Sequence, residues 1–148
     1  MFMTKIVVDT NVLLSALFSN QGGSFRLVQT VLDYAEKGYI MNIVSVPLVL
    51  EYEEVLLRPK NKVQYPYLSE NDLKLFIADI VSISHPVKLH FLWRPFLKDS
   101  GDDKVLETAV NGGASIIVTF NTKDFEGVEK HFGIRILTPK ELFEQGVL

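Results

Sequence analysis

The sequence predicts an α/β fold in which helices cover a mostly parallel sheet. Short apolar runs rich in β-branched residues alternate with longer amphipathic stretches along the chain. The runs lack polar alternation, which is typical of strands buried on both faces in a parallel sheet. Four such strands are expected, at residues 6–8, 39–45, 115–119 and 134–137.

Helices are expected between these strands. An apolar helical stretch at residues 12–18 follows the first strand. After two glycines, Ser24 can cap a helix that reaches about residue 37, with its apolar side chains on one stripe. Pro47 is tolerated in a first helical turn, and the next helix is expected at residues 48–57.

Helices of the second half of the chain each begin at a residue that can cap a helix. They are expected at residues 69–81, 100–110 and 138–145. In the second of these, Ser100 and Asp103 have the spacing of a capping box. Residues 58–68 are expected to form a loop and residues 85–87 a short extended piece, whereas no element is predicted for residues 91–98.

The composition indicates one folded domain spanning residues 1–148. The chain has no cysteine, 15 Lys and Arg against 18 Asp and Glu, and a formal charge of -3. It therefore excludes a disulfide scaffold and a zinc site that needs cysteine. No run of about 18 apolar residues and no signal-peptide layout is present, so we expect a cytoplasmic protein without membrane contact. The mild acidity argues against nucleic-acid binding by bulk charge alone.

Acidic and amide side chains follow the expected strands. Because ligands of parallel sheets bind at the carboxyl ends of the strands, these side chains are candidates for one site. The candidates are Asp9 after the first strand, Glu51 on the helix after the second, Asp102 and Asp103 in a first helical turn, and Asn121 and Asp124 after the third. Carboxylates this close would repel unless protons or a hard cation such as Mg²⁺ or Mn²⁺ bound there. A divalent ion so held serves phosphodiester hydrolysis.

Each acid also has an ordinary structural interpretation. Asp9 starts a good turn sequence, and Asp102 and Asp103 suit the dipole of a helix N-terminus. Spacing alone does not choose between Glu51 and Glu53, which flank the apolar arc of their helix on opposite sides. The whole constellation is therefore more informative than any single member.

Two stretches without acids combine cations and aromatic residues, at residues 58–67 and 85–98. Such stretches can hold single-stranded nucleic acid by phosphate pairing and base stacking. A solvated loop with aromatic side chains packed on the core or on a partner is an equally good interpretation. The three histidines show no ligand spacing.

Four segments together resemble the PIN-domain family. They are IVVDTNVLLSA at 6–16, VPLVLEYEEVL at 46–56, KDSGDDKVLETA at 98–109, and IVTFNTKDF at 117–125 followed by ILTPKEL at 136–142. The most similar subgroup is that of prokaryotic PIN proteins described as toxins of toxin–antitoxin pairs, similar to VapC toxins. The resemblance implies a three-layer α/β/α fold and a Mg²⁺- or Mn²⁺-dependent ribonuclease. Possible partners are then an RNA substrate, an antitoxin protein and a second copy in a homodimer.

The resemblance also assigns roles to residues. Asp9 and Asp102 match acids that bind metal, and Glu51 matches the second acid in preference to Glu53. Asp103 is one residue out of register and is a further metal candidate, and Asp99 is a further residue that can contribute to the site. Asn121 stands where many members carry a fourth Asp, with Asp124 three residues later.

Four further residues complete the predicted site. Thr10 and Asn11 match small polar residues that orient the first acid, and Lys104 and Lys123 are candidates to touch substrate phosphate. A catalytically silent PIN scaffold that binds RNA or a partner protein is the alternative function. A phosphate-accepting receiver domain ranks last, because Val8 rather than a second acid precedes Asp9.

Overall fold

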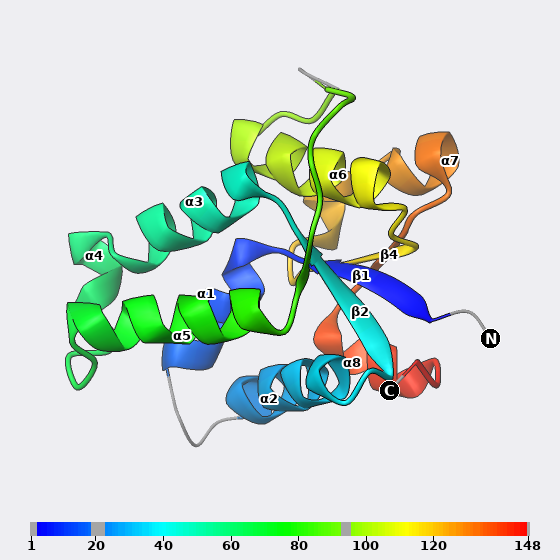
Figure 1. Cartoon of the computed structure of the whole chain (residues 1–148). Coiled ribbons are helices and arrows are strands. Elements are labelled where there is room, and N and C mark those ends of the chain that lie inside the picture. Colours follow the sequence, from blue (N-terminus) through cyan, green and yellow to red (C-terminus); the bar gives the residue numbers. More distant parts are fainter. Residues whose placement is uncertain (1–2, 19–22, 93–95, 148) are drawn as a thin grey trace.

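A computed structural model describes residues 3–18, 23–92 and 96–147. Its strands form one five-stranded sheet with the order β3-β2-β1-β4-β5, and all neighbours are parallel; Figure 1 labels the three inner strands β2, β1 and β4. The strands are β1 (Thr4–Val8), β2 (Ile40–Val44), β3 (His85–Pro86), β4 (Ile116–Val118) and β5 (Arg135–Leu137). The α/β prediction is confirmed, and β3 is the short extended piece expected at residues 85–87.

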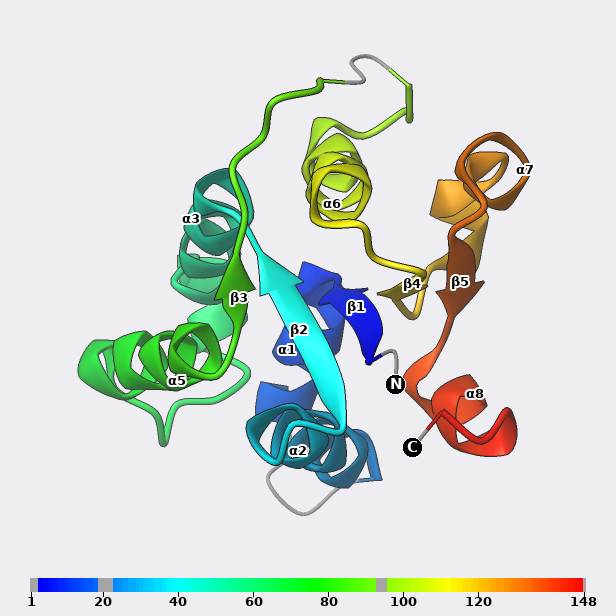
Figure 2. The same ribbon diagram turned by 45° about the vertical axis from the view of Figure 1, so that its right-hand side comes forward.

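Helices cover both faces of the sheet, as the three-layer arrangement requires (Figure 2). One face carries α6 (Ser100–Gly112) and α7 (Val128–Phe132); the other carries α1 (Thr10–Phe18), α2 (Gly23–Glu36) and α8 (Pro139–Glu144). On the β3 side lie α3 (Val46–Leu56), α4 (Pro59–Lys62) and α5 (Glu70–Ser82). Parallel neighbours need such crossover helices, because their ends lie at opposite edges of the sheet.

Strand β1 lies in the middle of the sheet and is buried on both sides. Ile6 and Val7 are fully buried, which explains the continuous apolar run in the sequence. The register places Val8 beside Val118 of β4, and the Asp9 amide donates to the Val118 carbonyl at 2.9 Å. Asp9 and Thr119 therefore follow their strands at the same carboxyl edge.

Side-chain caps fix where several helices begin. Ser45 caps α3, Ser69 forms a capping box with Asp72 at α5, and Thr138 forms one with Glu141 at α8. At its other end α6 stops at Gly113, whose φ of 66° lies in the left-handed region that favours glycine.

The N-terminus of α6 differs from the prediction. The cap residue is Asp99 rather than Ser100, and the Asp99 side chain accepts from the Gly101 amide at 2.7 Å. The buried Asp103 carboxylate accepts instead from the Leu97 amide at 2.8 Å. It therefore holds the chain that leads into α6.

Three short elements were not predicted: α4 inside the expected loop 58–68, a 3-10 turn at Thr122–Phe125, and α7. Each is too short for an apolar period to stand out in the sequence. Part of the basic-aromatic stretch, residues 93–95, lies outside the described residues. None of the helices in the described part of the chain combines the length and the apolar character needed to cross a membrane.

Candidate active site

Acidic side chains from four separate segments line one cavity of about 190 Å³ at the carboxyl edge of the sheet. The polar lining consists of Asp9, Thr10, Asn11, Glu51, Asp99, Asp102, Asn121 and Asp124. The structure thus brings together the predicted residues Asp9, Thr10, Asn11, Glu51, Asp102, Asn121 and Asp124, and also Asp99, which the sequence analysis had named as a further contributor. Asp103, Lys104 and Lys123 do not line this cavity.

Asp9 is fixed in direction by two hydrogen bonds. Its Oδ1 accepts from the Thr10 amide at 2.7 Å, and its Oδ2 accepts from Thr119 Oγ1 at 2.8 Å. Only 7% of Asp9 is exposed. Burial raises its pKa to about 6, with smaller contributions from the negative charges of Asp124 and Glu51, while the two hydrogen bonds act in the opposite direction.

Thr119 connects the ends of β1 and β4 and was missed by the sequence analysis. Besides donating to Asp9, its Oγ1 accepts from the Asn121 amide at 3.0 Å and from Asn11 Nδ2 at 3.3 Å. Asn11 Oδ1 in turn accepts from the Phe120 amide at 3.3 Å. Asn11 therefore acts on Asp9 through Thr119. The available signal was the polar residue that ends the apolar run 116–118.

Helix α3 carries Glu51 to the cavity because its neighbour Tyr52 is anchored to β1. The fully buried Tyr52 hydroxyl donates to the Val8 carbonyl, directly before Asp9. Burial raises the pKa of Tyr52 above its usual value, so the hydroxyl stays protonated and keeps donating. Glu51 lines the cavity and Glu53 does not, which separates the two candidates that spacing could not.

Glu51 also contacts helix α6. Its Oε2 pairs with Lys104 Nζ at 3.1 Å. A Cβ atom at Gly101 would lie 3.0 Å from Glu51 Oε1, so only glycine leaves this carboxylate its present room. Ser45 donates to Thr108, which itself donates to the Lys104 carbonyl at 2.7 Å, and this joins the two helices in the same region.

The pKa of Asp102 is raised as well, to about 7. Burial is the main cause of this increase, and the negative charges of Asp9, Asp99, Asp124 and Asp103 act in the same direction. These charges raise the pKa of Asp102 only if they lie close to it. The cavity therefore concentrates negative charge that is only partly balanced, since Glu51 alone among its acids has an ion-pair partner within the described residues.

The side chains that line the cavity are of the chemical type that binds a hard divalent cation. Its side chains offer oxygen only, the ligand preferred by Mg²⁺ and Mn²⁺, and no histidine lines the cavity. Thr10 Oγ1 is buried there and has no hydrogen-bond partner among the described groups. No three Asp, Glu or His side chains in the described ranges stand close enough to hold a metal ion in their present positions. Binding would therefore require the carboxylates to move closer together.

A second cavity adjoins the first and shares Asp99, Asp102 and Asp124 with it. Its volume is about 590 Å³, and its remaining lining is Phe96, Leu97, Lys98, Lys123 and Glu126. Lys123 therefore lies beside the acids, as a contact to substrate would require, whereas Lys104 is engaged with Glu51.

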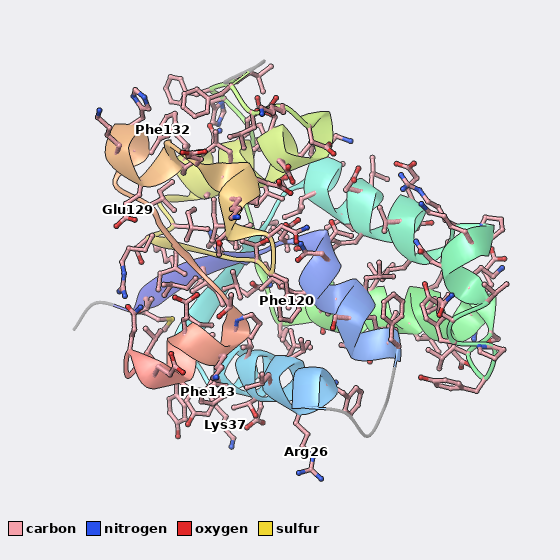
Figure 3. All side chains as sticks on the ribbon, turned by 180° about the vertical axis from the view of Figure 1, so that it is seen from behind. Arg26, Lys37, Phe120, Glu129, Phe132 and Phe143 are labelled. Carbon is pink, nitrogen blue, oxygen red and sulfur yellow. The ribbon has the colours of Figure 1, made fainter. Side chains whose placement is uncertain are left out.

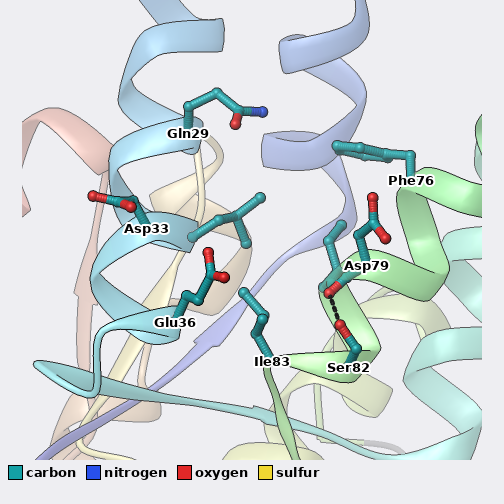
Figure 4. Close-up of a pocket in the computed structure, with 9 residues that line it drawn as sticks. Gln29, Asp33, Glu36, Phe76, Asp79, Ser82 and Ile83 are labelled. Atoms are coloured by element: carbon teal, nitrogen blue, oxygen red, sulfur yellow. Dashed lines mark hydrogen bonds between the residues drawn. The ribbon is translucent and has the colours of Figure 1, made fainter.

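A third cavity, of about 370 Å³, lies between α2 and α5, far from these acids (Figure 4). Its lining includes Asp33, Glu36 and Asp79, with an apolar floor. Asp33 is paired with Lys37 at 2.9 Å. The cavity sits where α2 and α5 lead into β2 and β3, at the amino ends of the strands, so it is no part of the candidate site.

Comparison with known families supports the fold and the site together. A family model described as PIN domain matches residues 5–123, which include β1 except for Thr4, strands β2 to β4 and, apart from Asp124, every acid that lines the first cavity. A search of the curated proteins found no match. Because the matched segment covers most of the chain, the protein belongs to the PIN-domain family and has the nuclease-type fold of that family.

Proposed function

We propose that this PIN domain, residues 1–148, is a metal-dependent endoribonuclease that hydrolyses RNA phosphodiester bonds. The observation that carries the proposal is the cavity at the carboxyl edge of the sheet, where Asp9, Glu51, Asp102 and Asp124 meet. The raised pKa values of Asp9 and Asp102 support it, because crowded carboxylates are relieved by a bound dication. Mg²⁺ or Mn²⁺ is the expected cofactor.

In this proposal Asp9 and Asp102 hold the ion, and Glu51, Asn121 and Asp124 orient water and substrate around it. A bound divalent ion lowers the pKa of water and stabilises charge on a phosphoryl oxygen. Thr119 and the Thr10 amide keep both Asp9 oxygens in one orientation before substrate arrives. Asp124 is exposed, so its carboxylate can accept a proton from the attacking water and release it to solvent.

Two predicted residues receive different roles from the contacts observed. Lys104 holds Glu51 in place through their ion pair, so we propose it as a positioning residue rather than a phosphate ligand. Asp103 is engaged by the Leu97 amide, and it contributes to the site by fixing the approach to α6.

Cleavage of single-stranded RNA by the purified chain, with and without Mg²⁺ or Mn²⁺, tests the proposal. We expect metal-dependent cleavage with 5′-phosphate and 3′-hydroxyl ends, and none by Asp9→Asn. Asp33→Asn is the matched control, because Asp33 is a half-buried acid that lines the remote cavity. Equal cleavage by the wild type and Asp9→Asn would overturn the assignment.

A catalytically silent PIN scaffold is the second candidate. The Lys104–Glu51 ion pair favours it, as does the neutral Asn121 where a fourth acid would add charge. Calorimetry with Mn²⁺ separates the two functions. A nuclease should bind Mn²⁺ with an affinity that Asp9→Asn and Asp102→Asn each reduce strongly, whereas a silent scaffold should show no binding that depends on these residues.

We further propose that the protein is the toxin of a cytoplasmic toxin–antitoxin pair and forms a homodimer. An antitoxin would inhibit it by covering the acidic cavity. Induced expression should then stop growth of a bacterial host, and Asp9→Asn should not. Co-expression of the product of a short reading frame beside the gene should restore growth and co-purify with the chain.

A further inference from the structure

We propose that the 590 Å³ cavity beside the acids is a binding subsite for one unpaired nucleotide of the RNA strand. Phe96 stacks on the base, and Lys98 and Lys123 hold the phosphates on either side of it. This inference rests on the proposed ribonuclease function. It adds the path of the RNA strand beyond the acids and the reason why that strand must be single-stranded.

The position of the cavity gives the first argument. It shares Asp99, Asp102 and Asp124 with the acidic cavity, so the two are continuous. A strand whose scissile phosphate lies at the acids therefore extends into the second cavity with its neighbouring nucleotide. The volume of about 590 Å³ is in the range of roughly 300–1,000 Å³ found for small-ligand sites.

Phe96 gives the second argument. Its ring packs edge-to-face against two rings of α7, with centroid distances of 5.3 Å to Phe132 and 5.5 Å to His131. Even so, 38% of Phe96 remains exposed. The ring is thus held by two neighbours before any ligand binds. A fixed and partly exposed aromatic ring is a suitable platform for a base, because little side-chain freedom is lost on stacking.

The two lysines give the third argument. Five lysines in the described part of the chain pair with a carboxylate, namely Lys37, Lys62, Lys74, Lys104 and Lys140. Lys98 and Lys123 line the cavity. Neither has an ion-pair partner among the described residues, so their charges are available to a ligand. Because the nearby carboxylates repel phosphate, a strand needs such cations to remain in place.

Binding can be measured apart from cleavage in an Asp9→Asn background, with a short fluorescent single-stranded RNA. Phe96→Ala should weaken binding at least about fivefold, the lower limit for loss of one base stack. Phe143→Ala is the matched control, because Phe143 is 36% exposed on α8 at the opposite end of the molecule from α7 (Figure 3). Equal affinities of these two variants would overturn the subsite.

The lysines are tested by the salt dependence of the same binding. Removal of both in Lys98→Ala/Lys123→Ala should make the slope of log affinity against log salt shallower by roughly 0.7 per lysine. Lys5→Ala/Lys140→Ala removes the same charge from the amino end of β1 and from α8, and it should leave the slope unchanged. Identical slopes in the two double variants would contradict the proposed phosphate contacts.

Further measurements keep the test decisive if Phe96→Ala unfolds. Phe96→Trp should restore affinity, whereas Phe96→Leu should keep the apolar contact with α7 but not the affinity. An RNA carrying 4-thiouridine beside the cleavage site should crosslink, in the Asp9→Asn chain, to the peptide that contains Phe96. A fully paired RNA should compete poorly, and crosslinking elsewhere or equal competition would contradict the proposal.

The two proposals fail separately. Binding that depends on Phe96 without any metal-dependent cleavage would refute the nuclease and leave the subsite. Cleavage that depends on Asp9, with KM and binding unaffected by Phe96→Ala, would refute the subsite and leave the nuclease.

Discussion

Thr119 Oγ1 donates a hydrogen bond to Asp9 Oδ2 at 2.8 Å and so joins the ends of β1 and β4 across 110 positions of sequence. Replacing it tests whether this contact orients Asp9. Thr119→Val keeps the shape and removes the hydroxyl, so Asp9 should lose a stabilising donor and its pKa should rise further. We expect about tenfold lower cleavage and weaker Mn²⁺ binding by calorimetry, equivalent to about 1.4 kcal/mol.

Thr30→Val is the control for this variant. Thr30 Oγ1 donates to the Arg26 carbonyl on α2, remote from the acids. The Thr30→Val variant should cleave RNA at the wild-type rate. A Thr119→Val protein as active as this control would show that the hydrogen bond does not matter for the site.

The raised pKa of Asp9 predicts how stability depends on pH. Its folded value of about 6 lies above its ordinary value of 3.8, so the folded state binds the proton more tightly than the unfolded state. The stabilising contribution is therefore complete below about pH 4 and is lost as pH rises to about 6 and above. The Asp9→Asn variant has no carboxyl group at this position, so its stability does not decrease in this pH range for the same reason.

Urea unfolding in EDTA at pH 4.5 and pH 7.5 provides the check. The stability of Asp9→Asn relative to the wild type should increase between these pH values by on the order of 2 kcal/mol. Parallel pH profiles for the two proteins would mean that Asp9 is not protonated more readily in the folded state.

Tyr52→Phe should destabilise the protein by about 1–3 kcal/mol, because the buried Val8 carbonyl loses its donor. It should also lower activity, since the same contact sets the distance between α3, which carries Glu51, and Asp9. Tyr39→Phe is the control, as Tyr39 is 64% exposed. Thermal unfolding and a cleavage assay measure both effects, and an unchanged midpoint would argue against the anchoring role.

Gly101→Ala should reduce activity more than stability. The added methyl group would lie 3.0 Å from Glu51 Oε1 and 3.2 Å from Asp99 Oδ1, so one or both carboxylates must move. Alanine favours helix over glycine by up to about 1 kcal/mol, which offsets part of the strain. We expect slower RNA cleavage at a nearly constant unfolding midpoint; cleavage at the wild-type rate would contradict a requirement for Glu51 in its present position.

The sequence predicted those parts of the fold that depend on local patterns. The run Ile6–Val8 and the caps Ser69 and Thr138 are local signals, and the structure confirms them. The prediction for the start of α6 was wrong: Asp99 rather than Ser100 is the cap residue, because both residue types can cap a helix and the local sequence does not choose between them.

The site shows the same difference between what local sequence signals predict and what only tertiary packing determines. Residues that follow strands could be found, since parallel strands end at a shared edge. Thr119 and Tyr52 could not be assigned a role, because their partners lie 110 and 44 positions away and only tertiary packing brings them together. The pairing of Lys104 with Glu51 was missed for the same reason.

Adjacent residues Asp102 and Asp103 face in two directions from the start of α6. One lines the acidic cavity, and the other is hydrogen-bonded to Leu97, next to Phe96. A small tilt of α6 would therefore displace the Asp102 carboxylate together with the main chain at Leu97. A single helix end thus connects the wall of the acidic cavity to the segment that lines the adjoining cavity, so a displacement of either one is transmitted to the other.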